Sequence, residues 1–127
     1  MRKQIGTTPK KGFRVRRNDA RDGRVIRKYT GPGGAVVIPA EIWGLPVREI
    51  GCSTFEGCSS LASVAIPDSV TQIGEDAFRE CSNLVTVNIS PIEHIWGKNS
   101  FDGCSKLSRA SHEALKKAQN IKVSIGF

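Results

Sequence analysis

Apolar residues recur at a fixed step of 23 residues through the middle of this chain. The step is kept by four kinds of residue: Phe55, Phe78 and Phe101; Cys58, Cys81 and Cys104; Gly51, Gly74 and Gly97; and Leu61, Leu84 and Leu107. Self-similarity at such a period indicates a repeat architecture, in which each copy buries its apolar face only by stacking on its neighbours.

Each copy begins with a strand pattern. Leu61, Val64 and Ile66 are the apolar positions, and the alternation around the last two is that of a strand. Pro67 lacks a backbone donor and ends the strand, while Gly74 permits a crowded or left-handed corner. Stacked copies would therefore align their strands in a parallel sheet, with Phe78 and its equivalents pointing inward.

The complete motif resembles a known repeat family. Residues 61–81 read L-x-x-V-x-I-P-x-x-V-x-x-I-G-x-x-A-F-x-x-C, which resembles the BspA-like leucine-rich repeats of the treponemal type. Residues 31–55 resemble the same pattern with five extra residues between Ile38 and Gly51, so the resemblance covers about Val25 to Leu107. It implies a non-enzymatic, protein-binding solenoid of bacterial surface or secreted proteins, which attach to host or matrix proteins.

We therefore expect an α/β, β-rich fold: a right-handed leucine-rich repeat solenoid with a parallel sheet and about four coils. An Asp22-Gly23 turn signal between alternating segments predicts an N-terminal capping hairpin. The expected division of the chain is 1–12 flexible basic tail, 13–34 capping hairpin, 35–107 repeats and 108–127 C-terminal cap.

The C-terminal cap is predicted to be a helix followed by a strand. Ser111 is the expected N-cap, and the helix should end near Asn120. Ile121, Val123 and Ile125 then alternate as a strand, either closing the stack or leaving an edge for self-association into a homo-oligomer.

The third copy departs from the repeat. Ile92 and Ile95 lie one place early relative to Val70 and Ile73, so Ile95 or Trp96 must turn outward or occupy unusual space. We expect the nearby His94 to lie on the surface and not to bind a metal.

The cysteines are interpreted as structural thiols. Cys58, Cys81 and Cys104 would form a buried ladder whose side chains point the same way, which disfavours disulfides, and Cys52 stands apart. Their spacing matches no zinc motif, so no metal or cofactor is predicted.

Positive charge is concentrated at the front of the chain. Residues 1–34 contain 11 Lys and Arg against two acids, and residues 35–127 contain 8 against 10. A nucleic-acid arm is the alternative to a solvated face, but the motifs of nucleic-acid binding are missing, so we expect only salt-sensitive, non-specific binding. We also expect neither a signal peptide nor a membrane span in these residues.

Alternation places a set of mostly small side chains on the outer face of the main sheet, and no set of catalytic residues is discernible. The predicted partner-binding residues are Val37, Ser63, Ala65, Thr86, Asn88 and Arg109, with Trp43 and Trp96 as aromatic contacts. Trp43 either folds over the flank of the stack or is an exposed contact. The first hypothesis is a module that binds a protein, such as a host or extracellular-matrix protein. The alternatives are a binder of a small hydrophobic ligand, with Val37, Ala65 and a tryptophan lining an apolar pocket, or a self-assembling structural protein.

Overall fold

The computed structural model describes residues 12–90 and 94–126, with the side chains of the C-terminal helix described up to Gln119. The elements in these residues are β1 (Phe13–Arg17), β2 (Arg24–Tyr29), β3 (Gly34–Val37), β4 (Glu41–Ile42), β5 (Leu45–Ile50), β6 (Leu61–Ala65), β7 (Gln72–Ile73), β8 (Thr86–Asn88), β9 (Ile95–Trp96) and α1 (Arg109–Gly126).

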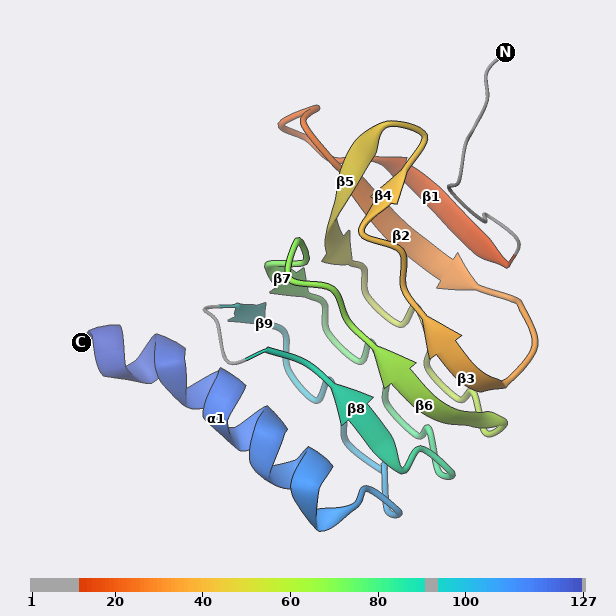
Figure 1. Ribbon diagram of the computed structural model, residues 1–127, viewed down its shortest axis with the longest axis vertical. Coiled ribbons are helices and arrows are strands. Elements are labelled where there is room, and N and C mark those ends of the chain that lie inside the picture. Colours follow the sequence, from red (N-terminus) through yellow and green to blue (C-terminus); the bar gives the residue numbers. More distant parts are fainter. Residues whose placement is uncertain (1–11, 91–93, 127) are drawn as a thin grey trace.

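The chain winds into a solenoid with two stacks of parallel strands. β3, β6 and β8 form one sheet, while β5, β7 and β9 continue the other sheet from the hairpin β1–β2. Turns connect β5 with β6 and β7 with β8, so they lead from the second sheet to the first sheet in the next coil (Figure 1). The predicted solenoid with a mostly parallel sheet is thus confirmed. Three coils are complete, and the fourth that we expected continues as helix α1.

Register follows from the repeat. Val36 pairs with Val64, and Val64 with Val87, so the inward positions of β3, β6 and β8 are aligned. The first step is 28 residues because the insertion adds five to the period of 23. All three valines are buried and join the same apolar core.

A ladder of aromatic rings runs along the turn side of the core. The rings of Phe55, Phe78 and Phe101 stack at centroid distances of 4.8 Å, nearly parallel. Tyr29 adds a fourth ring 5.0 Å from Phe55, and Phe13 lies 5.0 Å from Tyr29. The hairpin therefore continues the ladder forward, which the 23-residue step did not predict because Tyr29 lies 26 residues before Phe55.

Close packing explains the repeated glycine at the corner of each coil. A Cβ at Gly74 would lie 2.6 Å from the backbone nitrogen of Cys52 and 2.7 Å from the carbonyl carbon of Gly51. Crowding by the preceding coil, and not a left-handed backbone, is the reason for glycine here.

Two left-handed positions recur in the turns between coils. The positive φ angles are at Ser53, Asp76 and Asn99, and again at Gly57, Glu80 and Gly103. Asn and Asp tolerate this conformation and Gly adopts it freely, so Glu80, with a φ of 60°, is the exception in the second set.

The hairpins at the front differ in how far the sequence predicts them. β1 and β2 pair antiparallel as expected, joined through Asn18, whose backbone and side chain bind the loop that ends at Gly23. A second hairpin, β4–β5, occupies the five-residue insertion, and its two-residue turn is Trp43-Gly44. Both turn residues have positive φ, 48° and 79°, which is the type I′ geometry.

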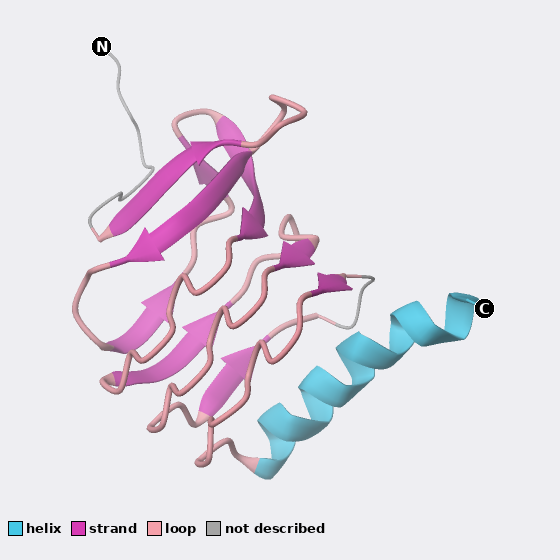
Figure 2. Cartoon of the chain, turned by 180° about the vertical axis from the view of Figure 1, so that it is seen from behind, coloured by secondary structure: helices cyan, strands magenta, loops and turns pink. Residues whose placement is uncertain are grey.

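The C-terminal prediction is wrong in two respects. Helix α1 continues to Gly126 (Figure 2), so Ile121, Val123 and Ile125 lie in a helix and form no strand. The hydroxyl of Ser108, not that of Ser111, accepts the backbone N–H at the helix start, at 3.1 Å. Ser111 instead accepts the N–H of Val87 at 2.8 Å, which ties the helix to the last strand.

Strand β9 of the third copy keeps the 23-residue register. Ile73 pairs with Trp96 and Gln72 with Ile95, so Trp96 takes the inward position and Ile95 turns outward, 57% exposed. Ile92 lies outside the described residues. The prediction of a surface His94 is wrong, because His94 is buried, with its ring edge-on to Trp96 at 5.5 Å.

The predicted division into domains stays a prediction, and the tail expected at 1–12 lies almost entirely outside the described residues.

Candidate functional site

The outer face of β3, β6 and β8 brings most of the predicted contact residues together. Strand pairing places Ser63 beside Thr86, and Val37 beside Ala65, which in turn is beside Asn88. Two parallel rows of side chains thus cross the sheet. Because nearly all of these side chains are small, the rows form a flat surface, which we call the sheet face.

Exposure on the sheet face is uneven. Val37 is 71% exposed and Val85, just before β8, is 41% exposed. Sequence reasoning missed Val85, and also Ala35, which is exposed and begins the row of Ser63. Adding the five inserted residues to the 23-residue step gives the 28-residue spacing from Ala35 to Ser63, and this signal identifies the row.

A shallow groove crosses the carboxyl ends of these strands. Its volume is about 370 Å³, and its walls include Val37, Ala65, Pro67, Asn88 and Ile89. Neither Trp43 nor Trp96 lines it, so the tryptophan expected in an apolar pocket is not there. Because the Val37 wall is largely exposed, the groove is open to solvent.

Arg109 lies at the border of the sheet face. It is the first residue of α1 and is exposed. The N–H of the preceding residue, Ser108, donates to the carbonyl oxygen of Val85 at 2.9 Å, which places Arg109 next to the outer edge of β8. The position is thus beside the sheet and not within a fourth strand.

The two tryptophans have different environments. Trp43 is 56% exposed at the tip of the β4–β5 hairpin, with the guanidinium carbon of Arg24 5.6 Å from its ring centroid. Trp96 is half-buried against His94 and Phe101. Of the two readings of Trp43, the exposed aromatic agrees with the structure.

The cysteine ladder is only partly as predicted. Cys81 and Cys104 are buried, and their thiols donate to the carbonyl oxygens of Phe55 and Phe78, at 3.1 Å each. Cys58 is half-buried and Cys52 is exposed, and all four are free. The neighbouring Cys104 thiol, together with burial, raises the pKa of Cys81, so this thiol stays protonated and unreactive.

A second cavity lies at the end of the stack. It has a volume of about 400 Å³ and separates the last turn, near Phe101 and Cys104, from Leu115 and Lys116 of α1. The sequence did not predict this cavity, because it led us to expect a strand at 121–125, where the structure has helix α1.

Two further findings concern the described part of the chain. Within residues 12–90 and 94–126, no three His, Cys, Asp or Glu side chains are grouped so as to hold a metal ion. The only helix in this part, α1, lacks the apolar length needed to cross a membrane.

Comparison with known proteins agrees with the geometry. The family model described as "BspA type Leucine rich repeat region (6 copies)" matches residues 40–124. No curated protein matches the chain. Among solved structures, a leucine-rich repeat protein of T. pallidum is 39% identical, with a TM-score of 0.75 over 79% of this chain and 47% of its own.

Two further structures are similar over smaller parts of their own lengths. A leucine-rich cell surface protein of Faecalibacterium prausnitzii is 32% identical, with a TM-score of 0.69 over 84% of this chain and 30% of its own. A leucine-rich repeat protein of Bacteroides ovatus is 26% identical, with a TM-score of 0.65 over 81% and 28%. The chain thus spans less than half the length of each of these three relatives.

Proposed function

Because this chain belongs to the BspA-type leucine-rich repeat family, we propose that it is a protein-binding module whose sheet face contacts the partner. The observation that carries the proposal is the pair of aligned rows ending in Val37, a valine 71% exposed beside a groove of about 370 Å³. A flat surface of small side chains admits a partner's backbone closely, and a few exposed apolar groups supply binding energy.

The partner that we propose is a host or extracellular-matrix protein. Support comes from family membership and from the F. prausnitzii relative, which is named a cell surface protein. A role at the bacterial surface, in adhesion, is part of the same proposal.

The small-ligand alternative has less support. Pockets for small molecules bury most of the ligand surface, whereas this groove is open along the exposed Val37 wall and lacks the expected tryptophan. Self-assembly through the C-terminal strand has lost its structural basis, since that segment is helical.

The test is a binding screen of the immobilised protein against extracellular-matrix proteins, with fatty acids and an apolar dye measured in parallel. Ala65→Arg places a long side chain in the centre of the sheet face, and Gln72→Arg makes a matched change on the exposed position of the opposite sheet. We expect Ala65→Arg to weaken binding about tenfold or more and Gln72→Arg to leave it unchanged.

Equal effects of the two substitutions would exclude the sheet face as the contact surface. Binding of fatty acids or the dye, lost on Ala65→Arg, without binding of any matrix protein would favour the small-ligand alternative.

A further inference from the structure

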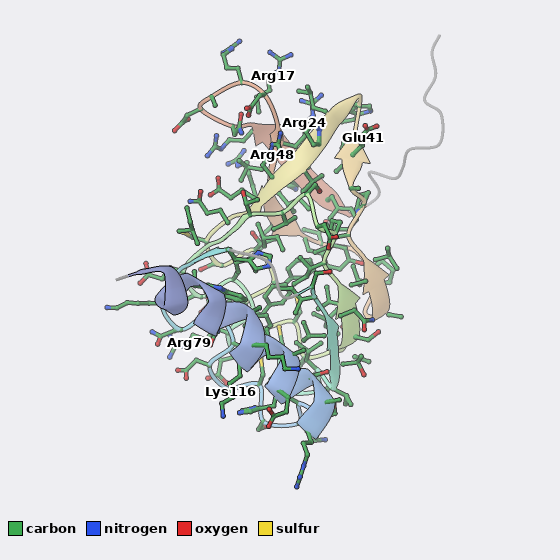
Figure 3. The ribbon with its side chains drawn as sticks, turned by 60° about the vertical axis from the view of Figure 1, so that its left-hand side comes forward. Arg17, Arg24, Glu41, Arg48, Arg79 and Lys116 are labelled. Carbon is green, nitrogen blue, oxygen red and sulfur yellow. The ribbon has the colours of Figure 1, made fainter. Side chains whose placement is uncertain are left out.

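Arginines gather at the hairpin end of the stack, far from helix α1. Residues 12–50 contain seven Arg and one Lys, whereas residues 51–126 contain two Arg and five Lys. Figure 3 shows Arg17, Arg24 and Arg48 at the hairpin end, with Lys116 on α1 away from it. This segregation of Arg from Lys is informative because protein interfaces are enriched in Arg and depleted of Lys.

Strand pairing forces three of these arginines together. Arg17 of β1 lies directly opposite Arg24 of β2, and like charges in that arrangement are unfavourable. β5 then brings in Arg48, whose side-chain stem lies over Gly23, next to Arg24 in the chain. Burial, and then the charge of Arg17, lower the pKa of Arg24, in agreement with this crowding.

Negative charge compensates the cluster only in part, although Glu41 lies at the same hairpin end (Figure 3). Residues 12–50 contain eight Lys and Arg but four Asp and Glu, a formal net charge of +4. In the part of the chain that the structure describes, the only ion pair is that of Arg16 with Asp19, at 3.8 Å and exposed. The carboxylate of Asp22 accepts a hydrogen bond from the side-chain amide of Asn18.

Trp43 is held beside this cluster by an arginine that is itself anchored. The Arg24 guanidinium donates to the carbonyl oxygens of Ile42 and Trp43, at 2.9 and 3.1 Å, and lies over the Trp43 ring. A bulky residue with a φ of 48° is strained in a turn position that favours Asn. Strain of this kind points to a role other than stability for the side chain that bears it.

We propose that Arg17, Arg24, Arg48 and Trp43, which we call the arginine end, form a second binding surface that takes an acidic segment of a partner protein. One carboxylate accepts two parallel hydrogen bonds from a planar guanidinium group. Asp or Glu side chains would therefore relieve the repulsion between the arginines. Trp and Arg are also the residues that dominate binding energy at protein interfaces. The proposal is independent of the sheet face.

The probe is a capped, fluorescently labelled peptide of alternating Glu and Gly, and its counterpart with Gln replacing Glu is the neutral control. Binding to the full chain is measured by fluorescence anisotropy at physiological salt, with a DNA duplex in a parallel series. The charge variant is Arg17→Gln with Arg48→Gln, which spares the anchored Arg24. The matched control is Lys116→Gln with Lys117→Gln, which removes two exposed charges from α1.

We expect the Glu peptide to bind, the Gln peptide not to bind, and the arginine double variant to weaken binding about tenfold or more. The lysine double variant should stay within about twofold, since α1 lies away from the hairpin end where the arginines gather (Figure 3) and salt screens exposed charges. Trp43→Asn should weaken binding while raising the melting temperature, because Asn-Gly suits a type I′ turn. Loss of binding through unfolding cannot produce that combination.

The proposal is overturned if the Glu peptide does not bind, or if the two double variants weaken binding equally, because net charge would then be the cause. Tighter binding of the DNA duplex, with the same dependence on Arg17 and Arg48, would identify a nucleic-acid surface instead. Unchanged peptide binding by Trp43→Asn would remove the tryptophan from the site.

Discussion

Replacing Phe78 with Ala tests the aromatic ladder. The Phe78 ring has no exposed surface and is stacked on both sides at 4.8 Å. Removing a fully buried phenylalanine typically costs about 3–5 kcal/mol, and each aromatic pair contributes about 0.5–1.5 kcal/mol beyond burial. The loss should therefore be near the top of the range, about 5 kcal/mol, which is a large part of the stability of a single domain.

The assay is thermal and urea unfolding followed by far-UV circular dichroism. At about 4 °C per kcal/mol for a chain of this size, Phe78→Ala should lower the melting temperature by about 20 °C. Phe101→Ala is the matched control: this ring is half-buried and has one phenylalanine neighbour, so its loss should cost about half as much. A Phe78→Ala melting temperature within a degree or two of the parent would refute the ladder, and equal losses would refute the effect of position.

Four other outcomes are expected. Gly74→Ala should cost about 3 kcal/mol in urea unfolding, since its Cβ meets backbone and not a movable side chain; a neutral result would mean that the coils separate easily. Glu80→Gly should raise the free energy of unfolding in urea by about 0.5 kcal/mol, through relief of left-handed strain; a lower urea midpoint would contradict this. Burial, partly opposed by Arg16, raises the pKa of Glu49 above its ordinary value of 4.5, so its charged form is unfavourable in the folded state. Glu49→Gln should therefore stabilise the protein at pH 7 and lose this advantage below pH 4.5, and a gain independent of pH would exclude ionisation as the cause. In thiol titration, Cys52 should react at once and Cys81 only after unfolding, and rapid reaction of Cys81 would exclude its burial.

The repeat pattern alone determined the solenoid. A step of 23 residues, kept by Phe, Cys, Gly and Leu, leaves each copy with apolar groups that only a neighbouring copy can cover. The inward positions of each strand followed from alternation, and so did the outward positions of Val37, Ser63, Ala65, Thr86 and Asn88. Whether these residues bind a partner stays a prediction.

Tertiary packing decided what the repeat did not specify. Ile121, Val123 and Ile125 alternate like a strand, but residues 109–125 contain neither Gly nor Pro, and Leu115 and Ala118 bury a helical face against the last coil. Alternation over five residues is too short a signal to outweigh that helix.

Contacts between residues distant in the chain decided the rest. His94 is buried because the register of β9 turns Trp96 inward beside it. The arginine end forms because β2, which contains Arg24, pairs with β5, which contains Arg48. These two arginines are 24 residues apart in the chain. No local pattern encodes such a meeting, since it depends on which strands pair, and strand pairing is set by the burial of the whole core.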